Sequence, residues 1–141
     1  MSLNKIFNLF DAIDEDTTPI GEAAFDFTDT PMFHLGMFKK LIWNQKSFET
    51  KMGKFKQAFP ESKIFEDEEA GEFVTFTRAY FYLNKFDFEH PLANDAIKLF
   101  SDIYTKTACE LSLNFFEEKE EYEKCAKIKK VLDSLNLNLE E

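Results

Sequence analysis

The segment from Thr30 to Pro60 constrains the fold most, because its pattern is that of one long helix. Thr30 and Pro31 form a helix-start signature, in which a hydroxyl caps the first turn and proline takes the first helical position. The helix has to end before Pro60, since proline disfavours helical geometry in the residue that precedes it. Between these limits, apolar residues recur at three- and four-residue steps on one stripe: Phe38, Leu41, Ile42, Phe48, Met52, Phe55 and Phe59. We therefore expect a basic amphipathic helix over residues 31–59.

The face of this helix opposite the apolar stripe carries lysines and the only tryptophan of the chain. Lys39, Lys40 and Lys46 surround Trp43 at helical spacing. Large aromatic residues dominate the hot spots of protein interfaces, and charged neighbours add electrostatic complementarity. A tryptophan that faces away from the apolar stripe therefore predicts a partner-binding surface made of Lys39, Lys40, Trp43 and Lys46.

Length and composition predict a single domain over residues 1–141, which is long enough to bury a core. Eighteen phenylalanines supply most of the apolar content, and each buries a large area, so we expect a phenylalanine-rich core. Cys109 and Cys125 have apolar neighbours in helical patterns and fit buried thiols in a reducing compartment. No stretch is apolar and long enough to span a membrane, and the first residues lack a leader pattern. We expect a soluble, cytoplasmic protein.

The remaining patterns predict a mainly α-helical fold of about five helices. Ser2 is placed to cap a short amphipathic helix that reaches Ile13. Residues 61–82 favour a helix, because an acidic start is followed by apolar residues at helical spacing: Phe73, Phe76, Tyr80 and Leu83. The high β-propensity of the same run leaves a minor β element around residues 63–78 as the alternative.

The apolar pattern of the C-terminal third, residues 91–136, predicts a helical hairpin or one long helix. A helical pattern begins at His90-Pro91 and continues through Phe116, and the polar run from Glu117 to Glu121 separates it from a second stripe. Residues 121–135 have the sequence EYEKCAKIKKVLDSL. This run resembles the second half of a UVR-type helical hairpin, a protein-contact module of excision-repair nuclease subunits, with a lysine where that helix usually carries an arginine. The resemblance implies two antiparallel helices.

Charge is segregated along the chain, which has a net charge of −10. Residues 1–30 carry one lysine and seven acidic residues, whereas residues 31–63 carry seven lysines and two acidic residues. Residues 64–97 have eight acidic and two basic residues, and residues 98–141 have ten acidic residues and seven lysines. The lysine face can therefore dock internally against acidic segments, or it can be presented to a partner. The overall charge disfavours nonspecific binding to nucleic acid or anionic membranes.

Motifs for catalysis or for metal binding are weak. Asp14 to Thr18 matches the D-x-D-x-T pattern of haloacid-dehalogenase-type phosphatases, but a helical pattern precedes it where that family has a buried strand. His90 has carboxylates near it in sequence, without the ligand spacing of a zinc site. No nucleophile motif or glycine-rich phosphate loop is present. We expect no catalytic residue, no metal and no cofactor.

These observations predict a non-enzymatic protein-binding module that acts as a small adaptor or inhibitor. Its small size, its acidity and an amino-acid composition typical of an AT-rich genome would suit a phage protein. One alternative is an acidic mimic of nucleic acid that inhibits a DNA- or RNA-binding protein. Its surface would consist of Asp14, Glu15, Asp16, Glu66, Asp67, Glu68, Glu69, Glu117, Glu118, Glu120, Glu121 and Glu123. A second alternative is a structural subunit that self-assembles through its aromatic stripes.

Overall fold

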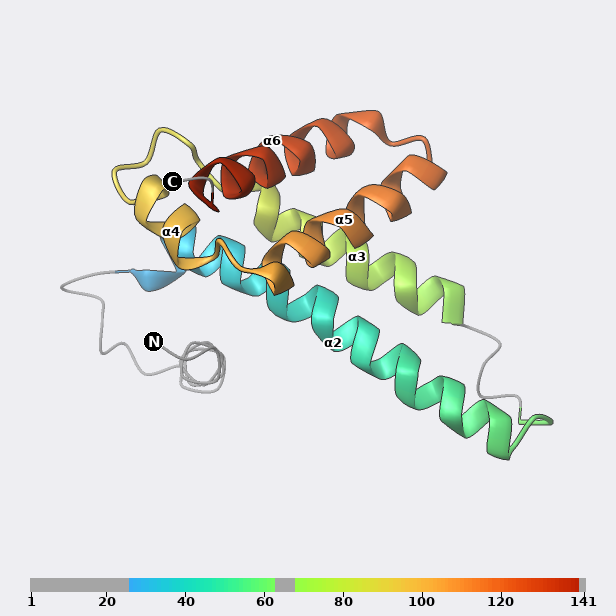
Figure 1. Cartoon of the computed structure of the whole chain (residues 1–141). Coiled ribbons are helices and arrows are strands. Elements are labelled where there is room, and N and C mark those ends of the chain that lie inside the picture. Colours follow the sequence, from blue (N-terminus) through green and yellow to red (C-terminus); the bar gives the residue numbers. More distant parts are fainter. Residues whose placement is uncertain (1–25, 63–67, 140–141) are drawn as a thin grey trace.

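The computed structural model describes residues 26–62 and 68–139, and this part of the chain is helical without a strand (Figure 1). A short 3-10 helix, η1, precedes five α-helices: η1 (Phe27–Asp29), α2 (Pro31–Ala58), α3 (Glu68–Asn84), α4 (Ala93–Leu99), α5 (Ile103–Glu118) and α6 (Tyr122–Leu139). The predicted mainly α-helical fold is confirmed. The helix favoured for residues 61–82 is confirmed over residues 68–82, as part of α3, so the β alternative is wrong for residues 68–78. Residues 61–62 are not helical, and residues 63–67 lie outside the described residues. The short helix predicted from Ser2 to Ile13 lies outside the described residues.

Local signals set both ends of α2 as predicted. The Thr30 hydroxyl accepts a hydrogen bond from the backbone N–H of Phe33 at 3.3 Å, and Pro31 takes the first helical position. The N–H of Phe59 closes the last turn on the carbonyl of Phe55 at 2.8 Å, immediately before Pro60. The observed helix ends at Ala58, one residue before the predicted end.

The C-terminal third forms a hairpin, but its first helical pattern is divided. Residues 100–102 separate α4 from α5, so the helix expected from His90 through Phe116 is two helices. The turn between α5 and α6 places Glu120 at a φ of 58°, a conformation that glycine usually supplies. Two backbone hydrogen bonds close this turn, from Glu121 N–H to the Phe116 carbonyl and from Glu120 N–H to the Glu117 carbonyl. This pairing is a Schellman motif, and it turns α6 back along α5.

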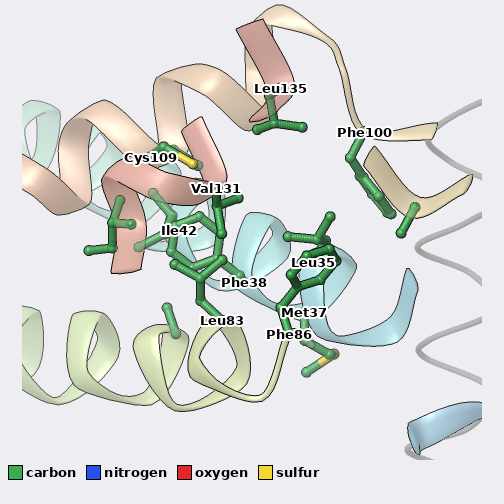
Figure 2. Packing of buried hydrophobic residues seen from close by; sticks show 14 of the residues in the cluster. Leu35, Met37, Phe38, Ile42, Leu83, Phe86, Phe100, Cys109, Val131 and Leu135 are labelled. Carbon is green, nitrogen blue, oxygen red and sulfur yellow. The ribbon is translucent and has the colours of Figure 1, made fainter. Parts of the chain in front are cut away.

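The helices pack around one apolar core. α2 packs along α3 and also contacts α4 and α5, while α6 packs mainly against α5 and closes the core. Figure 2 shows side chains from α2, α3, α5 and α6 meeting there, Phe38, Leu83, Cys109 and Val131 among them. Seven phenylalanines are buried, as the composition predicts: Phe33, Phe38, Phe76, Phe86, Phe100, Phe115 and Phe116.

Both cysteines are free and buried, as expected. Burial raises the pKa of the Cys109 thiol to about 12, with a smaller contribution from the charge of Glu110. A thiol with this pKa stays protonated at neutral pH, so Cys109 acts as a packing group rather than as a nucleophile. Among the described helices, none has the length and apolar character needed to cross a bilayer.

Leu135 and Leu137 of α6 test this packing, because Leu135 is fully buried and Leu137 is exposed. We expect Leu135→Ala to lower the free energy of unfolding by about 2–5 kcal/mol, since it removes buried apolar atoms and leaves a cavity. Leu137→Ala should cost less than about 1 kcal/mol. Urea unfolding followed by circular dichroism measures both values, and equal losses would contradict the placement of α6.

We expect the buried His34 to make the stability of the fold depend on pH. It lies buried in the first turns of α2, and burial lowers the pKa of its imidazole from 6.5, with a further contribution from Lys85. Asp29 and the Thr28 backbone act in the opposite direction. Native His34 therefore stays neutral at pH values where the unfolded chain already binds a proton.

Because the unfolded state binds more protons, the stability that neutral His34 contributes is present above pH 6.5 and is lost as the pH falls below it. His34→Gln cannot take up this proton but keeps a polar side chain, because a neutral amide replaces the imidazole. We expect the wild type to lose more unfolding free energy than the variant between about pH 7.5 and about pH 5.5. Equal losses in the two chains would show that His34 does not control the acid response.

Candidate functional site

Lys39 lies in the core rather than on the predicted outer face of α2. Its residue is only 1% exposed, so the expectation that it faces outward with Lys40 and Lys46 is wrong. The Nζ atom donates to both carboxylate oxygens of Asp102, each at 3.0 Å. The buried position is possible because the aliphatic stem packs among apolar groups while the charge finds this carboxylate.

Asp102 is also the residue that starts α5. Its Oδ1 accepts from the backbone N–H of Thr105 at 2.8 Å and from the Thr105 hydroxyl at 3.1 Å. One carboxylate therefore caps α5 and neutralises an ammonium of α2, two roles that both favour a negative charge at this helix N-terminus. Our sequence analysis missed Asp102, although an aspartate just before a helical apolar pattern is an N-cap signal.

Aromatic rings surround the buried ammonium. The Lys39 Nζ atom lies 5.6 Å from the ring centroid of Phe100 and 5.8 Å from that of Tyr104, which is within the range of cation–π attraction. Burial lowers the pKa of Lys39 from its ordinary value, and the hydrogen bond and charge of Asp102 oppose this shift. The ion pair and the rings together join the first half of α2 to the start of α5.

Trp43 lies one turn after Lys39 and contacts the same part of α5. Its Nε1–H donates to the backbone carbonyl of Tyr104 at 2.8 Å. The two aromatic rings meet edge to face, with centroids 5.4 Å apart and planes at 72°. Trp43 is half-buried, so it faces away from the main apolar stripe, as predicted, and packs on α5.

Exposed apolar groups continue outward from this tryptophan. Tyr104 is 50% exposed and the adjacent Ile103 is 68% exposed at the first turn of α5. We call the surface formed by the two aromatic residues Trp43 and Tyr104, together with the aliphatic Ile103, the aromatic patch. Lys40 and Lys46 lie three residues before and after Trp43 on the same side of α2. Lys40 is partly buried, and Lys46 forms an exposed ion pair with Glu49 at 3.5 Å.

The four predicted partner-binding residues therefore separate into two roles. Lys40, Trp43 and Lys46 lie at the surface of α2, whereas Lys39 supports the patch from below through Asp102. Tyr104 was missed, because its proximity to Trp43 depends on how α5 docks on α2. Ile103 was missed with it, since it precedes Tyr104 in the first turn of α5.

The acidic residues of the nucleic-acid-mimic alternative fall on two separate elements where the structure describes them. Glu68 and Glu69 are exposed at the start of α3. The others lie at the turn between α5 and α6: Glu117, Glu118, Glu120, Glu121 and Glu123. Of these, Glu121 is partly buried and pairs with Lys124 at 3.1 Å. The remaining ones lie outside the described residues: Asp14, Glu15, Asp16, Glu66 and Asp67.

Within residues 26–62 and 68–139, no group of three or more His, Cys, Asp or Glu side chains is arranged to hold a metal ion. No protein-family model matches the sequence, and no curated protein or solved structure shows significant similarity to it.

The coupling between Lys39 and Asp102 can be measured with a double-mutant cycle. We expect Asp102→Ala to lower the free energy of unfolding by about 3 kcal/mol, because it removes the cap and leaves a buried ammonium unpaired. Lys39→Met should cost less than about 1.5 kcal/mol, since the remaining carboxylate reaches water and still caps α5.

The variant that carries both substitutions should be more stable than Asp102→Ala alone, because no buried charge is left without a partner. Chemical denaturation of the four chains provides the measurement. A double variant whose loss equals the sum of the two single losses would contradict an energetic coupling of this pair.

Proposed function

We propose that this chain is a non-enzymatic protein-binding module, a small adaptor or inhibitor that contacts its partner through the aromatic patch. The observation that supports this most is the fixed edge-to-face pair of Trp43 and Tyr104, beside which Ile103 is largely exposed. Tryptophan and tyrosine are enriched at interface hot spots, because they bury a large area and also offer a polar group.

The patch is organised before any partner arrives. The hydrogen bond from Trp43 to the Tyr104 carbonyl holds one ring, and the Lys39–Asp102 pair beneath holds the first turn of α5. A surface that is already ordered loses less conformational entropy on binding than a flexible one. This arrangement favours recognition over a purely structural use of the tryptophan.

The chemistry around the patch indicates the kind of partner. Lys40 and Lys46 flank Trp43 on α2, so a complementary surface would place an apolar side chain on the patch and carboxylates at its edge. Lys39 is excluded from direct contact by its burial, and its role is to position Tyr104.

Ile103→Glu tests this proposal without disturbing the core. The side chain is exposed, and an acidic residue in the first turn of a helix is favourable for folding. We expect the variant to fold normally and to lose roughly tenfold or more in affinity for the partner. Trp43→Ala is less informative, because the indole also packs on α5.

The matched control is Tyr122→Glu, since Tyr122 begins α6 as Ile103 begins α5 and is 64% exposed. Wild-type and variant chains are used to capture proteins from nuclease-treated lysate of the source organism, and the partner is then purified and titrated. Loss of binding in Ile103→Glu alone supports the proposal. Undiminished affinity of this variant would contradict it, and capture of a nucleic-acid enzyme only at low salt would favour mimicry instead.

A further inference from the structure

The two halves of α2 differ in how far their residues are buried. Residues 31–39 are buried with the exception of Met32, whereas within the described chain no residue from Asn44 to Ala58 is buried. Figure 1 shows this half of α2 running away from α5 and α6, with the start of α3 beside it. We call residues 44–59 and 68–75 the projecting end.

The apolar stripe predicted for α2 is therefore divided. Phe38 and Ile42 belong to the core, while Phe48, Phe55 and Phe59 are 53%, 39% and 57% exposed. The rings of Phe55 and Phe59 lie 4.8 Å apart and form one surface on the last turns. Helices in proteins gain most of their stability by burying an apolar face, so this face is suited to covering by another helix.

Charge indicates which helix would cover it. Residues 44–58 of α2 contain four lysines and one glutamate, whereas residues 68–75 of α3 contain three glutamates and no basic residue. The projecting end therefore has a basic helix and an acidic helix side by side. In a twofold-symmetric contact, α2 of each copy faces α3 of the other, so that opposite charges meet on both sides.

A hollow in the projecting end provides space for this contact. It has a volume of about 440 Å³ and is lined by Phe48 and Gly53 of α2 and by Glu68 and Glu72 of α3. A Cβ atom added at Gly53 would meet no other atom within 4 Å, so the backbone there is open to approach.

We propose that two copies of this chain associate through their projecting ends into an isologous dimer, with Phe48, Phe55 and Phe59 of both copies at its centre. Lys51 and Lys54 of each α2 are exposed and face the Glu68 and Glu69 carboxylates of the other copy. This interface does not use Trp43, Ile103 or Tyr104, although Lys46, which flanks Trp43, lies within the projecting end.

Sedimentation equilibrium of the full chain over roughly 1 to 500 μM tests the proposal. The mass should rise from 16.6 kDa toward twice that value. Phe55→Glu combined with Phe59→Glu should remain monomeric. Phe81→Glu, which replaces a phenylalanine of α3 that is as exposed as Phe59 but lies outside the projecting end, should dimerise normally. Circular dichroism confirms that each variant is folded.

A charge swap tests which helices meet. Lys51→Glu with Lys54→Glu should weaken the dimer at least roughly tenfold, and adding Glu68→Lys with Glu69→Lys should restore it. The proposal is overturned by a wild-type chain that stays monomeric at every concentration, by a dimer that survives the double phenylalanine substitution, or by a charge swap that does not restore association. Ile103→Glu should still dimerise, so a failed dimer and a failed partner surface are distinguishable.

Discussion

One buried ion pair joins α2 to the start of α5. An ammonium inside an apolar core is stable only when a carboxylate meets it with good geometry, because both groups lose hydration on burial. Lys39 finds that carboxylate in Asp102, which is 63 residues away in sequence and is held in place as the cap of α5. The start of α5 therefore has to sit at one position on α2, and this constraint fixes the register of the two helices.

The aromatic patch and the hairpin follow from that register. With α5 anchored over Lys39, the Tyr104 carbonyl lies within hydrogen-bonding distance of the Trp43 indole, and Ile103 remains at the surface. The Schellman turn at Glu120 then brings α6 back over the core. The contacts of Lys39 and Trp43 with α5 lie in the first half of α2. The second half of α2 instead has an exposed apolar face that includes Phe48 and Phe55. The proposed partner surface is therefore centred at the middle of α2, and the proposed dimer contact lies toward its C-terminal end.

The limits of α2 could be predicted to within one residue, because the Thr30 cap and the proline after Phe59 act locally. The helical character of α3 was predictable from spacing in the same way, and the Asp102 cap left a local signal that we overlooked. The burial of Lys39 was not predictable, since spacing along one helix cannot show that a distant carboxylate will cover it. For the same reason, helical spacing places Phe48, Phe55 and Phe59 on one face of α2 but does not show that this face is exposed. The proposed partner surface could be predicted only in part, because it combines Trp43 of α2 with residues of α5.

The central claim is that the buried ion pair holds the surface on which Trp43 is displayed. Because Trp43 is the only tryptophan, its indole N–H gives a single resonance whose exchange with solvent can be followed by NMR. The substitution Asp102→Ser keeps a capping oxygen but removes the charge that pairs with Lys39. Our account predicts slow exchange of the indole N–H in the wild type and clearly faster exchange in this variant. Fast exchange in the wild type, or equal rates in the two chains, would contradict it.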